Sequence, residues 1–139
     1  MLHLAKLAVG VRDLAQLQSA QRARAQQAPP LRHLTRNHPR RAAEVIDGGS
    51  IYWVVCGIML VRQRILDIRP DAAQDGSKRT ALVLDPELVA VRPRATKAFQ
   101  GWRYLAADAA PSDLARGRAD GADALPEPLR RALAGLGLL

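Results

Sequence analysis

The stretch 51-IYWVVCGIMLVRQRILDI-68 decides the fold, because it is rich in β-branched and aromatic residues and gives the strongest strand signal in the chain. As one uninterrupted strand it would extend about 60 Å, at roughly 3.3 Å per residue. A domain of this length has a radius of gyration of about 14 Å, so the strand must be interrupted. We expect a bulge or corner at Gly57, where a side chain is missing.

The residues before this stretch predict one strand and two helices. Leu2–Val9 is typical of a first strand, and Val11–Gln27 of a helix that ends before Pro29-Pro30. A basic stretch, Leu31–Arg41, leads into a second, short helix. Pro39 suits the first position of that helix, and Gly48-Gly49 suits a left-handed exit from it.

The residues after the stretch predict a hairpin and further short strands. We expect 58–68 to pair with Thr80–Leu84 across the polar loop Arg69–Arg79, which contains an Asp75-Gly76 turn. Leu88–Val91 and Trp102–Leu105 are candidate short strands. Ala106–Ala124 is of low complexity and is predicted to be a mobile surface segment, and Pro126–Leu138 a closing helix. The 139 residues fit a single α+β domain, 1–139.

The composition limits the cellular compartment and the kinds of disulfide or metal site that the chain can form. Cys56 is the one cysteine, which excludes an internal disulfide and a multi-cysteine zinc site, and its apolar surroundings predict a buried core thiol. The apolar part of Met1–Gly10 is too short for a secretory signal, and no run approaches the roughly 20 apolar residues that span a bilayer. We therefore expect a cytoplasmic protein without membrane contact.

The chain is strongly basic, with a net charge of +8, and all but three of its 21 basic residues are arginine. A GC-rich genome would account for the number of arginines but not for their position. No acidic residue lies between Leu14 and Ala43 or between Leu88 and Ala107, whereas Asp108–Pro128 is acidic. Separation into acid-free blocks favours a cationic face for a polyanion over a merely solvated basic surface.

The second acid-free block also holds three of the five aromatic residues, Phe99, Trp102 and Tyr104. Cations between aromatic rings suit an unpaired nucleic-acid base, since guanidinium groups bind phosphate and flat rings stack on bases. The alternative is that these rings serve the core. Trp102 and Tyr104 share a face if the segment is a strand, and we expect at least one of them to be buried.

Arg40 and Arg41 stand at the start of the predicted short helix, where the helix dipole disfavours cations. Free backbone N–H groups and two guanidinium groups there would form a cradle for phosphate or carboxylate. The alternative is that both arginines pair with acidic residues such as Glu44 or Asp47.

The sequence contains no catalytic or metal-binding signature. His33 and His38 lack a third ligand nearby, and both are predicted to be polar loop residues. Neither a glycine-rich phosphate loop nor a nucleophile elbow is present. We therefore expect no metal and no cofactor.

Several motifs resemble a known family. They are Leu2–Val11, Pro30–His33 with Thr35–Asn37, Asp47–Val55 continuing into Val61–Asp67, and Phe99–Leu105. Together they resemble a family of alphaproteobacterial proteins known as a domain of unknown function, over nearly the whole chain.

A second resemblance concerns the fold. A short helix that ends in glycine, followed by a strand and then by Val61–Ile68, is similar to the helix-then-barrel order of PUA-like and ASCH-like domains. This resemblance implies a small mixed β-barrel with flanking helices and a cleft for RNA or modified bases beside the short helix. Arg40 and Arg41 would then lie at the cleft mouth, and Arg62 and Arg64 on a barrel strand.

The sequence thus predicts a non-enzymatic nucleic-acid-binding protein, with RNA as the expected ligand. The alternative is an enzyme or sensor for a small anionic ligand, such as a nucleotide or modified nucleoside, held in a closed aromatic pocket. The predicted phosphate-contacting and stacking residues are Arg32, Arg36, Arg40, Arg41, Arg62, Arg64, Lys97, Trp102, Arg103 and Tyr104.

Overall fold

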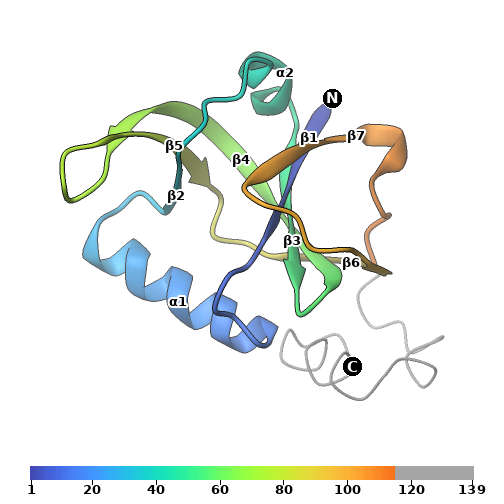
Figure 1. The fold of residues 1–139 in the computed structure, drawn as a ribbon. Helices are drawn as coiled ribbons and strands as arrows, with labels where there is room; N and C mark the ends of the chain where they lie inside the picture. The colour runs from blue at the N-terminus through green and yellow to red at the C-terminus, as the bar shows by residue number, and fades with distance from the viewer. Residues whose placement is uncertain (115–139) are drawn as a thin grey trace.

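The computed structural model describes residues 1–114 of the chain, which form seven strands, two α-helices and a 3-10 turn (Figure 1). In chain order the elements are β1 Leu2–Leu7, α1 Leu14–Gln27, β2 Arg32–Thr35, α2 Ala42–Ile46, β3 Ser50–Val55, β4 Ile58–Ala72, β5 Lys78–Leu84, β6 Val89–Ala95, β7 Trp102–Ala106 and the turn Ala107–Ala109. Neither of these two helices is long and apolar enough to cross a membrane.

The strands form one open mixed sheet in the order β2-β5-β4-β3-β1-β7. The long strand β4 organises it, because β3 pairs with one edge of β4 while β5 and β6 follow one another along the other. Strands β1 and β3 are parallel, and the other pairs are antiparallel. The α+β class is confirmed. The predicted barrel is not closed, since β2 and β7 end the sheet and do not pair with each other in residues 1–114.

The interruption predicted at Gly57 is a hairpin turn, not a bulge within one strand. Cys56 and Gly57 both have positive φ, 50° and 81°, which suits a two-residue turn between right-twisted strands. The chain therefore reverses between β3 and β4. The prediction of a buried Cys56 is wrong for the same reason: its side chain stands at an exposed turn, with Sγ 3.3 Å from the carbonyl oxygen of Arg12.

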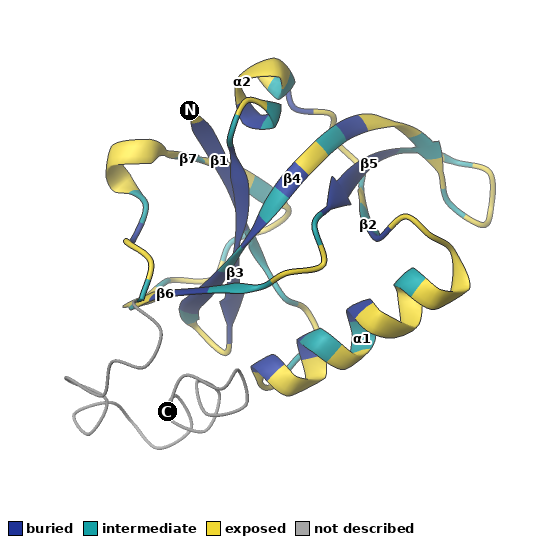
Figure 2. Cartoon of the chain, turned by 180° about the vertical axis from the view of Figure 1, so that it is seen from behind, coloured by how far each residue is buried: buried dark blue, intermediate teal, exposed yellow. Residues whose placement is uncertain are grey.

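Helix α1 begins three residues later than expected, at Leu14 instead of Val11, because of its cap. The Asp13 carboxylate accepts a hydrogen bond from the Gln16 backbone N–H at 2.9 Å. The Gln16 side chain accepts one from the backbone N–H of Arg12, the residue before the cap, at 2.7 Å, in a variant of the capping box. The buried side of α1 faces the sheet (Figure 2).

Strand β2 lies within the basic stretch Leu31–Arg41, for which the sequence predicted no strand. Arg32 pairs with Val83 and Thr35 with Thr80, so β2 is an edge strand on β5. The four residues of β2 show no alternation of buried and exposed side chains that would predict a strand. Polar and charged residues are common in a strand at the edge of a sheet. The predicted loop Arg69–Arg79 is also shorter than expected, because β4 continues to Ala72 and β5 begins at Lys78.

A buried polar network crosses the main core. Gln63 on β4 has no exposed surface, and its amide exchanges two hydrogen bonds of 2.9 Å with the amide of Gln21 on α1. Its Oε1 also accepts from Trp53 Nε1 at 3.0 Å, and its Nε2 donates to the carbonyl of Asp85 at 2.7 Å. One side chain therefore links α1, β3, β4 and the β5–β6 connection.

The two glycines after α2 serve different purposes. Gly48 has a φ of 94° and makes the left-handed exit predicted for this helix. Gly49 lies so close to the carbonyl oxygens of Leu2 and Val45 that a Cβ would overlap both. The approach of α2 to β1 therefore requires glycine at position 49.

The first part of the segment predicted to be mobile is bonded into the fold. Ala107–Ala109 forms the 3-10 turn, and Asp113 bridges to Val91 of β6. The remainder of this segment and the predicted helix Pro126–Leu138 lie outside the described residues.

We expect Gln63→Leu to lower the free energy of unfolding by about 3 kcal/mol or more, since it leaves the Trp53 indole, the Gln21 amide and the Asp85 carbonyl without their partner, at roughly 1–3 kcal/mol each. Urea unfolding followed by tryptophan fluorescence measures the change. Gln26→Leu, on the exposed side of α1, is the control and should change stability by less than about 0.5 kcal/mol. Equal effects of the two substitutions would contradict the role given to the network.

Candidate anion-binding site

The segment between β2 and α2 meets the far edge strand β7. Trp102 Nε1 donates a hydrogen bond to the carbonyl of Asn37 at 3.0 Å, and the Arg41 backbone N–H donates to the Tyr104 hydroxyl at 3.1 Å. The Trp102 and Tyr104 rings pack edge to face, 5.1 Å apart. Two acid-free segments that are more than sixty residues apart in sequence therefore lie together, and side chains connect the two ends of the open sheet.

We call this region the β7 surface and define it by five of the predicted site residues: Arg36, Arg40, Arg41, Trp102 and Tyr104. The arginines are exposed, Trp102 is half-buried and Tyr104 is 36% exposed. The polar atoms of both rings are already bonded to protein groups. Tyr104 therefore offers the larger part of any stacking surface. Trp102 packs against the core but stays half-buried, so the expectation that one of the two rings is buried is wrong.

The predicted anion cradle at the start of α2 is not formed. The helix has five residues and begins at Ala42, so Arg41 is its cap and not a first-turn residue. Arg41 pairs with Glu44 through two hydrogen bonds of 2.5 and 2.7 Å, which raises the pKa of Arg41. The alternative pairing considered for Arg41 is therefore the one observed, whereas no such contact holds Arg40 among the described residues.

Other predicted arginines lie elsewhere or have partners. Arg62 binds Asp113 through two hydrogen bonds of 2.7 Å, which raise the pKa of Arg62 and lower that of Asp113. Arg64 donates to the carbonyls of Gly49 and Ile65 at 2.9 and 3.1 Å. These two arginines hold structural groups together and do not join the β7 surface.

The remaining predicted residues are placed individually. Arg103 alternates with Trp102 and Tyr104 along β7 and covers the Phe99 ring, with Cζ 4.2 Å from the ring centroid. Lys97 is exposed and precedes Phe99 by two residues in the chain. Arg32 forms an ion pair with Asp71 at 3.0 Å and lies at the rim of a cavity on the other side of β2.

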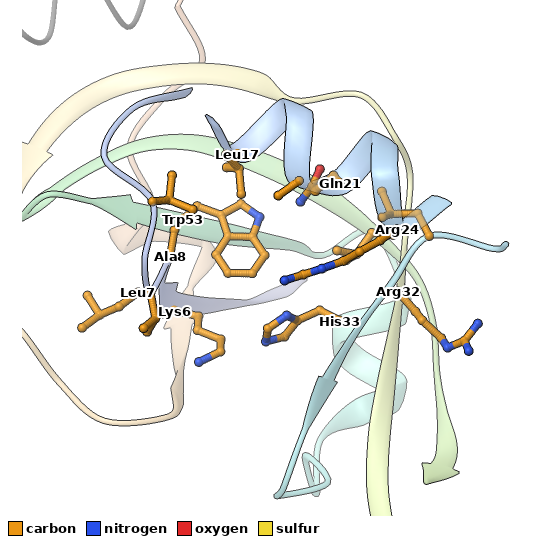
Figure 3. Close-up of a pocket in the computed structure, with 14 residues that line it drawn as sticks. Lys6, Leu7, Ala8, Leu17, Gln21, Arg24, Arg32, His33 and Trp53 are labelled. Carbon is orange, nitrogen blue, oxygen red and sulfur yellow. The ribbon is translucent and has the colours of Figure 1, made fainter. Parts of the chain in front are cut away.

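That cavity has a volume of about 200 Å³ and lies between α1, β2 and the ends of β1 and β3. Leu17, Leu31, Trp53 and Leu84 supply apolar walls, and Lys6, Gln21, Arg24, Arg32 and His33 the polar ones. In Figure 3 the side chains of Lys6, Arg24 and His33 lie near one another on one side of the Trp53 ring, whereas Arg32 points away. No carboxylate is among the described residues that line this cavity.

The electrostatics of the cavity are those of crowded like charges. Burial, with the positive charges of Lys6 and Arg24, lowers the pKa of His33 from 6.5 to about 4, and burial also lowers the pKa of Lys6. The His33 ring stands edge-on to Trp53 at 5.3 Å, and its Nε2 is buried without a hydrogen-bond partner in residues 1–114. A neutral histidine beside two cations has the chemistry to receive an anion.

Sequence reasoning missed Lys6, Arg24, His33 and Trp53 as site residues. Lys6 offered a signal, since it is the one charged residue in the predicted strand Leu2–Val9, where only His3 is also polar. The strand register places it between Trp53 on β3 and Trp102 on β7. Its neighbours Arg24 and His33 come from α1 and β2, and only the fold brings them to it. The prediction that His33 is a loop residue is wrong, because it lies on β2 with its ring largely buried.

Stability should fall as the pH drops below about 6.5, because unfolded His33 then takes up a proton that the folded protein excludes until about pH 4. By pH 5 the loss from His33 is about 2 kcal/mol. Urea unfolding at pH 7 and pH 5 measures it, and His33→Gln should show a smaller drop. Part of the drop should remain, since burial also lowers the pKa of His3. If the free energy of unfolding fell as much between pH 7 and pH 5 in His33→Gln as in the unchanged protein, His33 would not be held neutral.

Comparison with known proteins agrees with the sequence motifs. A family model described as "Protein of unknown function (DUF1489)" matches residues 4–139. The curated proteins and the solved structures gave no match. The resemblance to PUA-like domains therefore stays a prediction. The family model, by contrast, covers nearly all of the sequence, and the chain belongs to this family of proteins of unknown function.

Proposed function

We propose that the protein binds a nucleic-acid strand at the β7 surface, with single-stranded RNA as the expected ligand and without catalysing a reaction. The observation that carries the proposal is the contact between the two acid-free segments through Trp102–Asn37 and Tyr104–Arg41. A PUA-like mode of binding, with RNA beside the short helix, is part of the proposal.

The charges of this surface favour a polyanion. Within residues 1–114, no carboxylate pairs with the exposed Arg36 or Arg40. The pair Arg41–Glu44 is about half exposed, and ion pairs at the surface contribute only about 0–1 kcal/mol. Arg41 can therefore exchange Glu44 for a phosphate at small cost. The half-exposed pair Arg32–Asp71 allows the same exchange at the other end of β2.

Strand β1 relates the β7 surface to the cavity. Lys6 pairs in register with Trp102, and the same lysine lines the cavity with Arg24 and His33. Arg24 on α1 and Lys6 on β1 therefore lie in a cavity that is one strand away from Trp102 on β7. A strand bound across both regions would place its phosphates beside cations of each, as single strands do in basic grooves.

A second candidate function is binding of a small anionic ligand by an enzyme or sensor. The cavity itself is the observation that favours it, because its apolar walls and convergent cations meet the description of a ligand pocket. The two functions differ in their ligands: a strand would need the β7 surface, whereas a small anion would need only the cavity.

The affinity for a fluorescein-labelled single-stranded oligoribonucleotide should fall steeply with salt in an anisotropy titration, since each phosphate that binds a cation of the protein releases counterions. The double variant Arg36→Gln, Arg40→Gln should bind more weakly. Its plot of log K against log salt should be shallower by roughly 1 to 1.5, because each arginine that no longer neutralises a phosphate reduces the slope by about 0.7.

The control double variant is Arg12→Gln, Arg22→Gln, which removes the same charge from exposed positions near the start and along the side of α1. It should keep the slope of the unchanged protein. No binding at low salt, or an equal loss of affinity in both double variants, would remove the proposal.

A further inference from the structure

The geometry points to the cavity between α1, β2 and the ends of β1 and β3 as a binding site for a phosphate monoester, held by Lys6 and Arg24 with His33 facing one of its oxygens. This inference rests on the second candidate function and deepens it by naming the ligand class, and it does not need a nucleic-acid strand at the β7 surface. Its ligand has two sources with the same chemistry: a free mononucleotide and the terminal phosphate of a strand.

The first step is the uncompensated charge. Lys6 and Arg24 come from different elements, β1 and α1, and their side chains lie near one another in Figure 3. No described lining residue carries a negative charge. Lys6 is half-buried and Arg24 exposed, and the positive charges of both lower the pKa of His33, which lines the same cavity. An anion bound between the two cations would meet two charges of opposite sign.

The second step is the unpartnered atom of His33. Buried polar atoms in proteins are normally hydrogen-bonded, and an exception indicates a partner that binds from outside. His33 Nε2 has none among the described residues. The ring cannot easily turn away, because β2 holds its backbone on β5 and the Trp53 ring packs against it at an interplanar angle of 86°. Nε2 therefore remains directed at the same space as the two cations.

The third step is the size and charge of the ligand. Ligand pockets usually enclose about 300–1,000 Å³, so a cavity of about 200 Å³ suits an anionic group and not a whole nucleotide. A phosphate monoester carries a charge of about −1.5 to −2 at neutral pH, which matches two cations better than the single charge of a carboxylate or an internal phosphodiester. Its three terminal oxygens also match three donors.

The rest of the ligand has room outside the cavity. A shallower depression of about 450 Å³ shares Arg24, Arg32 and His33 with it and extends past Leu34. Leu34 is one of the few large apolar residues that is exposed. A sugar or base attached to the phosphate would lie in this depression, next to the exposed apolar side chain.

The test compares ligands that differ only in the monoester. Isothermal titration should detect binding of adenosine 5′-monophosphate and inorganic phosphate but not of adenosine. The same oligoribonucleotide with a 5′-phosphate should bind about tenfold more tightly than with a 5′-hydroxyl if the source is a strand end, and equally if it is a free nucleotide. Equal heats from adenosine and its monophosphate, with no heat from phosphate, would overturn the inference.

Matched variants locate the site. Arg24→Gln and Lys6→Gln should each weaken binding of adenosine 5′-monophosphate by roughly tenfold, since each removes a charge-assisted hydrogen bond. Arg22→Gln is the control, because Arg22 lies on the same helix two residues away and lines a different depression. An equal loss of affinity in Arg22→Gln and Arg24→Gln would place the ligand elsewhere.

The NMR signal of His33 should also shift on addition of phosphate, and a signal that does not move would contradict the proposed contact.

These results are independent of nucleic-acid binding. If the 5′-hydroxyl strand binds with the expected salt dependence while phosphate and the monophosphate do not bind, the cavity inference fails alone. If the monophosphate binds while the strand does not, the strand proposal fails alone.

Discussion

The amide of Gln63 is the interaction on which the rest of the structure depends. A fully buried amide is tolerated only when its donors and acceptors are satisfied, and here it meets Gln21, Trp53 and the Asp85 carbonyl. These bonds determine how α1 lies on the sheet and how the Trp53 ring is oriented. The ring in turn forms one wall of the cavity and supports His33. The geometry of the candidate phosphate site is therefore connected to the core by direct contacts.

A second constraint acts at the ends of the sheet. Closing a barrel would require backbone pairing between β2 and β7, whereas this fold joins the chain after β2 to β7 through the Trp102 indole and the Tyr104 hydroxyl. Side chains join elements that the backbone leaves apart, so the segment 36–41 can remain basic and irregular. This arrangement exposes Arg36 and Arg40 beside aromatic residues without placing their charges in the core.

The arginines of the chain perform two different tasks. Arg62 and Arg64 bind a carboxylate and backbone carbonyls, and these contacts stabilise the region around α2 and Asp113. Arg24, Arg36 and Arg40 have no carboxylate partner among the described residues. A sequence shows both groups as the same residue type in the same basic surroundings. Only the distance to an acidic residue distinguishes a structural arginine from one that is available to a ligand.

The sequence by itself determined the α+β class, the family and the positions of six of the seven strands, because these depend on local propensity, turn residues and long motifs. It also indicated the break at Gly57 and the exit at Gly48. Only the tertiary structure decided the hairpin reversal, the edge strand β2 and the cavity around Lys6, Arg24 and His33. The physical reason is that these features depend on strand register and on contacts between residues far apart in sequence, as with Lys6 between Trp53 and Trp102.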